Sequence, residues 1–127
     1  MIKKTMTPAF NETDALGHIN NTVVPRWFEN ARVPIFRIFT PDLNPNDWHL
    51  IVVKIEIEYT AQIGYQHDVE ITTEVSHVGN SSFVVDQCVY QSGVLCAKGK
   101  TVMVHFDYQA QKPASLTDDQ KLHLNEV

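Results

Sequence analysis

One stretch of the chain has the hydrophobic period of an α-helix, and long alternating segments follow it. Between Val24 and Phe39, apolar side chains recur every three or four residues and form one wide apolar face. Because proline kinks or ends a helix when it lies in the interior, Pro34 divides this stretch. We therefore predict a helix from Thr22 to Val33, followed by a bend or a second short turn to Phe39.

Beyond residue 50 the hydrophobic period changes from helical to two. From Ile51 to Tyr59, odd positions are apolar and the later even positions are charged, which predicts a half-buried strand. Glycine-containing turns at 79–81 and 91–93 divide the run from Val69 to Phe106 into a three-strand antiparallel meander. The tail from Thr117 to Leu124 is predicted to be a marginal helix capped by Thr117. With one substantial helix, the sheet must curve around that helix to bury both apolar faces, so we expect one α+β domain over residues 1–127.

Composition excludes several classes of function. The chain has 127 residues with a net charge of −5, which argues against a nucleic-acid or anionic membrane surface. No apolar run approaches the roughly 20 residues of a membrane helix, and the first residues lack the apolar core of a signal peptide. Cys88, Cys96 and the six histidines lack metal-ligand spacing. We expect a cytoplasmic protein with reduced thiols and no bound metal.

The segment from Phe10 to Asn21 concentrates the polar chemistry of the chain. Asp14 precedes a short polar run that leads into the predicted helix, namely Gly17, His18, Asn20 and Asn21. An acid that follows a strand and faces a helix N-terminus can activate water, and the free N–H groups of the first helical turn can hold a developing oxyanion. The alternative is a polar loop in which Asp14 or Asn21 only caps the helix.

Three parts of the sequence resemble the hotdog-fold acyl-CoA thioesterases of the hydroxybenzoyl-CoA thioesterase-like family. The segment 12–21 with Trp27-Phe28-Glu29-Asn30-Ala31-Arg32 is similar to that family's acid–Gly–His–x–Asn–Asn loop and the helix after it. Ile55-Glu56-Ile57-Glu58-Tyr59, Gly64 and Val69-Glu70-Ile71 resemble the strand after the helix and its turn. The third part resembles the closing meander and comprises residues 79–83, Gly93, Ala97, Gly99 and Val102.

The resemblance implies a hotdog fold, a curved antiparallel sheet wrapped around one long central helix. It also implies hydrolysis of an acyl-CoA or acyl carrier thioester to a free acid and a thiol. Asp14 would be the catalytic carboxylate, as general base or as nucleophile, and a backbone N–H near Asn21 would polarise the thioester carbonyl. The implied substrate-binding residues are Gly17, His18, Asn20, Asn21, Tyr59 and Gly64. No cofactor is expected, because coenzyme A is part of the substrate.

Two positions depart from the family pattern, and two other functions compete with hydrolysis. Val24 stands where the family usually has a tyrosine, and residues 61–68 replace its proline and Gly-Asp turn. His18 is either a second acid–base group or a residue whose hydrogen bonds hold the loop. Asp14 and His18 would also suit a hotdog hydratase or dehydratase acting on a carbon–carbon double bond. The third function is non-catalytic acyl binding, against which we count the cost of a buried carboxylate without a task.

The expected fold also predicts self-association. A single curved sheet leaves its helix and the loop before that helix incompletely covered. Hotdog relatives pair two chains side by side, so the resemblance implies a homodimer, or a homotetramer built as a dimer of dimers. We expect Asp14 and Asn21 of one chain to meet the segment from Tyr59 to Gly64 of the other.

Overall fold

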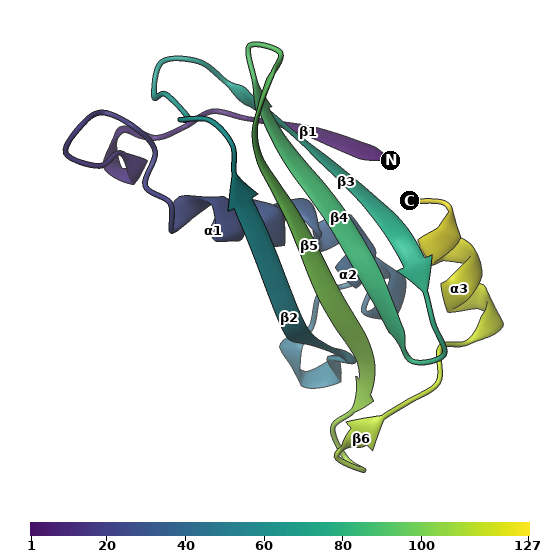
Figure 1. Cartoon of the computed structure of the whole chain (residues 1–127). Helices are drawn as coiled ribbons and strands as arrows, with labels where there is room; N and C mark the ends of the chain where they lie inside the picture. Colours follow the sequence, from purple (N-terminus) through teal and green to yellow (C-terminus); the bar gives the residue numbers. More distant parts are fainter.

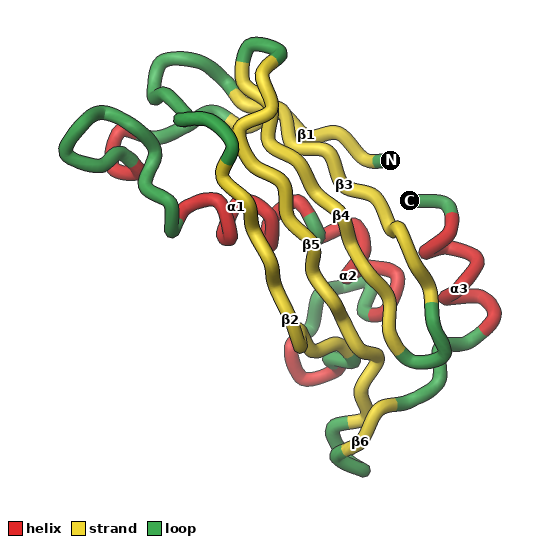
Figure 2. Tube along the Cα trace, viewed as in Figure 1, coloured by secondary structure: helices red, strands yellow, loops and turns green.

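A six-stranded antiparallel sheet with helices on one of its faces is the main feature of the computed structural model, which describes residues 1–127 (Figures 1 and 2). The elements in chain order are β1 (Ile2–Met6), the 3-10 turn η1 (Phe10–Glu12), α1 (Val23–Ala31), α2 (Val33–Phe39), the 3-10 turn η2 (Pro45–Asp47), β2 (Leu50–Tyr59), β3 (Val69–Val78), β4 (Ser82–Gln91), β5 (Val94–Asp107), β6 (Lys112–Pro113) and α3 (Asp118–Asn125). The strand order is β1-β3-β4-β5-β2, and the short β6 pairs with β5. The predicted α+β class and the β3-β4-β5 meander are confirmed.

The central helix is divided into two parts, as Pro34 predicts. Helices α1 and α2 meet at Arg32, and Pro34 lies in the first turn of α2, where its missing N–H would have no helical acceptor. The apolar face of α1 is buried against the sheet and consists of Val23, Val24, Trp27, Phe28 and Ala31. No helix in the structure combines the length and the apolar character that crossing a membrane requires.

Strand β2 differs from its prediction, because it is an edge strand and not a half-buried one. The side chains of Val53 and Ile55 are 55% and 46% exposed, although both are apolar. The pairing with β5 also shifts register between Val52 and Lys54. Val52 pairs with Met103 before the shift, and Ile55 pairs with Thr101 after it. Because Met103 and Thr101 are buried, Val52 and Ile55 both lie on the inner face of the sheet. Simple odd–even alternation therefore describes only the second half of the strand.

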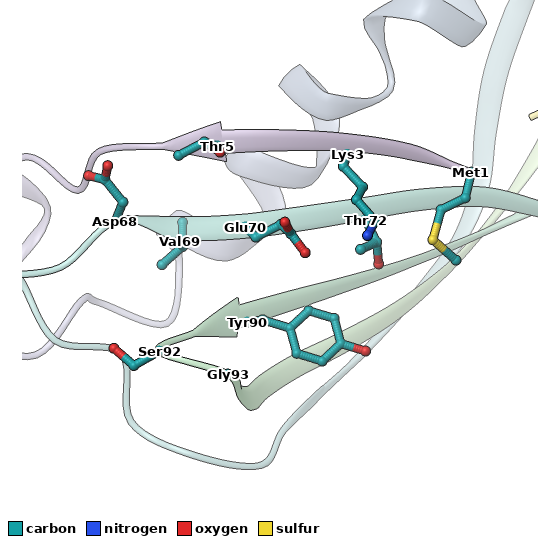
Figure 3. A pocket seen from close by; sticks show the side chains of 10 residues that line it. All are labelled: Met1, Lys3, Thr5, Asp68, Val69, Glu70, Thr72, Tyr90, Ser92 and Gly93. Atoms are coloured by element: carbon teal, nitrogen blue, oxygen red, sulfur yellow. The ribbon is translucent and has the colours of Figure 1, made fainter.

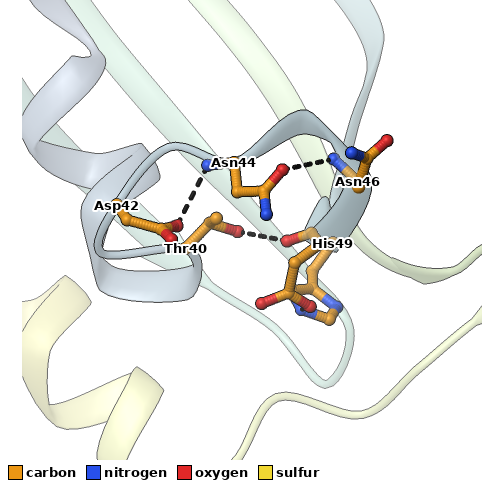
Figure 4. Close-up of polar contacts among 6 residues, drawn as sticks. Thr40, Asp42, Asn44, Asn46 and His49 are labelled. Carbon is orange, nitrogen blue, oxygen red and sulfur yellow. Dashed lines mark hydrogen bonds and ion pairs between the residues drawn. The ribbon is translucent and has the colours of Figure 1, made fainter.

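The connection from α2 to β2 is shaped by side chains that replace regular backbone hydrogen bonds (Figure 4). The Asp42 carboxylate accepts from the Asn44 N–H and the Asn44 side chain accepts from the Asn46 N–H, both at 3.0 Å. The Thr40 hydroxyl donates to the Asp47 carbonyl at 2.7 Å. These contacts set the point at which β2 begins.

Two hydrophobic clusters fill the space between the sheet and the helices. The first lies under α1 and contains Trp27 and Phe28 with residues of β3, β4 and β5. The second contains Ile35 and Phe39 of α2 together with Leu124 of α3. Helix α3 packs against α2 and β3, and the Thr117 side chain caps it by accepting from the Gln120 N–H, as predicted.

A buried polar layer separates the two clusters. It contains Arg32 at the break between the helices and Gln87, Thr73 and Thr101 on the sheet. The Gln87 amide donates to the Phe28 carbonyl and the Thr73 hydroxyl at 3.0 Å, and the Arg32 guanidinium donates to the Gln87 side-chain oxygen at 3.2 Å. The Arg32 Nε has no acceptor, and burial lowers the pKa of this guanidinium despite the neighbouring Glu29. The layer fixes the C-terminal end of α1 on the middle of the sheet.

Candidate active site

Asp14 lies in a tight loop between Thr13 and Ile19. It does not end β1, as the sequence suggested, because β1 stops at Met6 and η1 intervenes. An antiparallel bridge between Thr13 and Ile19 closes the loop, and the Asp14 N–H donates to the His18 carbonyl at 2.7 Å. Gly17 has a φ of +80°, the left-handed region that glycine adopts without strain, so the predicted tight turn is present.

The two oxygens of the Asp14 carboxylate have different surroundings. Oδ1 accepts from the backbone N–H groups of Leu16 and His18, at 2.8 and 3.1 Å. Oδ2 accepts no hydrogen bond from the chain, and the residue is exposed. The His18 backbone holds the loop, whereas its imidazole forms no hydrogen bond, so the loop-holding role predicted for this residue belongs to its main chain. One half of the carboxylate is fixed and the other is free to react.

The beginning of α1 carries backbone N–H groups without acceptors. Thr22 occupies the N-cap position, and the Asn20 side chain accepts from both its N–H and its hydroxyl, at 2.9 and 2.8 Å. Neither Asp14 nor Asn21 caps the helix, so that alternative is wrong. The N–H groups of Asn21 and Val24 donate to no group of the chain. Together with the helix dipole, they make this end of α1 electropositive.

The end of β2 lies beside this helix N-terminus in the same chain (Figure 1). The Tyr59 hydroxyl donates to the Asn21 carbonyl at 2.5 Å, and burial raises the pKa of the Tyr59 phenol, which keeps it a donor. His18 forms an antiparallel bridge with Gly64. The expectation that Asp14 and the segment from Tyr59 to Gly64 come from different chains is therefore wrong. Strand β2 runs back along α1 and delivers this segment to its own Asp14 loop.

These segments enclose a cleft of about 440 Å³. Its lining residues are Asp14, Ile19, Asn20, Asn21, Val24, Tyr59, Thr60, Ala61, Gln62 and Ile63. Four of the predicted site residues thus line it, while Gly17, His18 and Gly64 are not among its lining residues. None of the six histidines lines it. The cleft combines a free carboxylate oxygen with unpaired N–H donors.

Two supporting residues were missed by the sequence analysis. The Glu12 carboxylate accepts from the Trp27 indole N–H at 3.0 Å and from the Ala9 N–H at 2.7 Å, which ties the Asp14 loop to α1. The Gln91 amide exchanges two hydrogen bonds with the backbone of Gly64, at 2.8 and 2.9 Å. Trp27 and Gly64 are 15 and 27 residues from these partners in sequence, so no local pattern marks either contact.

A second hollow, of about 480 Å³, lies on the outer face of the sheet over β1, β3 and β4 (Figure 3). Lys3, Glu70 and Tyr90 are among its lining residues, and no helix end borders it. No three His, Cys, Asp or Glu side chains of the chain converge as ligands of a metal ion. Of these two hollows, only the Asp14 cleft has a carboxylate beside a helix N-terminus.

Comparison with known proteins identifies the family to which this fold belongs. The family model of the thioesterase-like superfamily matches residues 8–124. A predicted thioesterase from Bacillus stearothermophilus is 40% identical with a TM-score of 0.94, covering 98% of this chain and 93% of that chain. A thioesterase from Thermus thermophilus, solved in complex with coenzyme A and Zn, is 27% identical with a TM-score of 0.86, covering 98% and 91%. The uncharacterized protein YsmA of Bacillus subtilis (strain 168) is 28% identical over 113 residues, which are 88% of this chain and 77% of that protein. The predicted hotdog fold is confirmed, and the chain belongs to the thioesterase-like superfamily.

Proposed function

We propose that this chain is an acyl-CoA thioesterase, which hydrolyses a coenzyme A or acyl carrier thioester to a free acid and a thiol. The observation that carries the proposal is the shared cleft of Asp14 and the α1 N-terminus. Asp14, whose Oδ2 accepts no hydrogen bond, lines this cleft together with Asn21 and Val24, whose N–H groups are unpaired. Thioester hydrolysis needs a base or nucleophile on one side of the carbonyl and hydrogen-bond donors for its oxygen.

Two routes through this geometry give the same products. In the first, Asp14 takes a proton from water, the water oxygen attacks the thioester carbon, and the C–S bond breaks as the thiolate leaves and is protonated. In the second, Asp14 attacks the carbon directly and forms a mixed anhydride, which water hydrolyses after the thiol has left. In both, negative charge collects on the carbonyl oxygen near the start of α1. Loss of one such donor costs about 2.7–4 kcal/mol in other enzymes.

A structural relative supports coenzyme A as the carrier. The Thermus thermophilus thioesterase was solved with coenzyme A bound, and it matches 98% of this chain. In the proposed reaction coenzyme A enters as part of the substrate and leaves as the thiol product, so the chemistry requires no separate cofactor.

The geometry of the cleft argues against the hydratase but agrees with non-catalytic acyl binding. A hydratase of the kind considered above pairs an acid with a histidine, and no imidazole lines the cleft. Non-catalytic acyl binding agrees with the geometry. Asp14 is exposed, so the energetic cost of burying a carboxylate does not count against that function. Catalysis therefore has to be measured directly.

The test is release of free thiol from a panel of acyl-CoA esters, followed with a chromogenic disulfide. Cys88 is half-buried and unpaired, so a Cys88→Ser background removes its reaction with the reagent. We expect turnover of at least one ester. Hydration of an enoyl-CoA without thiol release would favour the hydratase, and binding without either reaction would favour the acyl-binding function.

The proposed enzyme is a homodimer at least, formed through the free edge of β2. An exposed apolar edge strand is a template for pairing with another chain. Antiparallel pairing centred on Ile55 would place Lys54 opposite Glu56 of the partner subunit, a self-complementary arrangement of charge. In the single chain these two side chains already form an ion pair at 2.8 Å. A tetramer would be a pair of such dimers.

A further inference from the structure

The floor of the Asp14 cleft is closed by tightly packed side chains. Ile19, Val24 and Ile63 line it and are each at most 7% exposed. All three belong to the hydrophobic cluster under α1, which continues with Trp27 and Phe28. Side chains buried to this extent in a hydrophobic cluster are packed closely, so an acyl chain could enter between α1 and the sheet only by displacing them.

Beside the cleft, the inner face of β2 offers a path of apolar side chains. After the register shift, this face presents Ile55, Ile57 and Tyr59. Ile57 is half-buried, whereas Ile55 is largely exposed. At about 3.3 Å per residue, the four steps from Tyr59 to Ile55 span roughly 13 Å, long enough for an extended acyl chain.

Tyr59 stands where the cleft meets this path. Its side chain is 48% exposed and lines the cleft. Its hydroxyl donates to the Asn21 carbonyl at 2.5 Å, so the phenol spans from the end of β2 to the start of α1. Val24, which stands where the family usually has a tyrosine, is buried and lines the same cleft.

We propose that Tyr59 is a gate that restricts this site to compact acyl groups, meaning short chains or a single ring. The gate separates the Asp14 cleft from the apolar face of β2, along which a long chain would otherwise lie. This inference rests on the proposed function, because it assigns the substrate class of the same site. Selection against long chains then arises from exclusion, since the closed floor gives extra methylenes no pocket.

The first experiment compares kcat/KM for thiol release across straight-chain acyl-CoA esters of two to sixteen carbons, used below their micelle concentrations. The wild-type protein is expected to hydrolyse butanoyl-CoA at least about 10-fold more efficiently than hexadecanoyl-CoA. Tyr59→Ala is expected to shift this ratio by about 10-fold or more toward the long ester. Tyr59→Phe keeps the ring but loses the bond to Asn21, so a smaller shift is expected. Tyr90→Ala, a matched truncation on the outer face of the sheet, should leave the ratio unchanged.

A second readout separates failure of the gate from failure of the proposed function. Non-hydrolysable S-alkyl-CoA thioethers of the same lengths are titrated calorimetrically against the wild type and Tyr59→Ala. If no ester is hydrolysed, the thioesterase proposal fails, while weaker binding of the long thioethers that Tyr59→Ala relieves would still support the gate. If Tyr59→Ala does not fold, Tyr59→Leu replaces it. Equal use of butanoyl-CoA and hexadecanoyl-CoA by the wild type, or an unchanged ratio in a folded variant, would overturn the gate.

Discussion

The reactivity assigned to Asp14 depends on the different hydrogen bonding of its two carboxylate oxygens. The backbone N–H groups of Leu16 and His18 hold Oδ1, whereas Oδ2 has no donor, and Asp14 lines the cleft. Such an arrangement fixes the carboxylate without neutralising it, which suits a base or a nucleophile. Gly17 makes the arrangement possible, because its positive φ closes the loop between the acid and the two N–H donors.

Replacement of Gly17 tests this loop. Gly17→Ala places a side chain at a φ of +80° in open space, so strain alone should lower the free energy of unfolding by about 1–2 kcal/mol. We also expect a loss of thiol release, because the strained loop displaces Asp14. Gly93→Ala is the matched control, with a φ of +79° and equally open space at the β4–β5 turn. Equal losses of activity in the two variants would contradict a special role for the Gly17 turn.

The two cysteines should differ in reactivity. Burial raises the pKa of the Cys96 thiol, so less thiolate is present at a given pH, and its Sγ donates to backbone carbonyls within the chain. Cys88 is half-buried on the outer face of the sheet. At pH 8, iodoacetamide is expected to label Cys88 well before Cys96, as measured by peptide mass spectrometry. Faster labelling of Cys96 would show that the β2–β5 edge opens.

Among the elements, α1 matters most, since the proposed oxyanion donors lie at its N-terminus and its Val24 forms part of the cleft floor. Its N-terminus is tied to Tyr59 and, through Trp27, to Glu12, and its C-terminal end is tied to Gln87. The break at Arg32 could be predicted from Pro34, and the meander from its alternation. The polar layer could not, because Arg32 and Gln87 are 55 residues apart. Neither could the register shift in β2, because Val52 and Val53 are both apolar.

The polar layer should be more sensitive to loss of Gln87 than to loss of Arg32. Gln87→Leu removes three buried hydrogen bonds, with the Phe28 carbonyl, the Thr73 hydroxyl and the Arg32 guanidinium, at a cost of about 0.5–1.5 kcal/mol each. Arg32→Met removes a buried cation that lacks an anionic partner, and such replacements by apolar residues are tolerated better. Urea unfolding of the two variants measures the difference. Greater destabilisation by Arg32→Met would show that the guanidinium itself holds α1 in place.

For the whole molecule, the unpaired edge of β2, with its exposed apolar side chains, is the strongest sign of a partner. Self-association stays a prediction from the sequence, which rests on one helix being unable to cover the sheet. The sequence could not assign the site to one chain, because the contact of Tyr59 with Asn21 depends on how far β2 runs along α1.

Light scattering at low micromolar concentration tests the dimer. We expect the wild type to have at least twice the 14.5 kDa mass of one chain. Ile55→Lys should give a folded monomer, because Ile55 is already 46% exposed and a charge there blocks pairing. Leu122→Lys, at an exposed apolar position on α3, should remain associated. A wild-type monomer would contradict pairing through β2.

Thiol release by Asp14→Asn tests the central claim, that the Asp14 cleft is the reaction centre, most directly. The asparagine oxygen can still accept from Leu16 and His18, so the loop and the midpoint of urea unfolding should be preserved. The amide can neither take a proton from water nor attack the thioester, so turnover should fall by about 100-fold or more. Asp118→Asn, in the first turn of α3, is the matched control and should keep wild-type turnover. Near wild-type thiol release by folded Asp14→Asn would contradict the account.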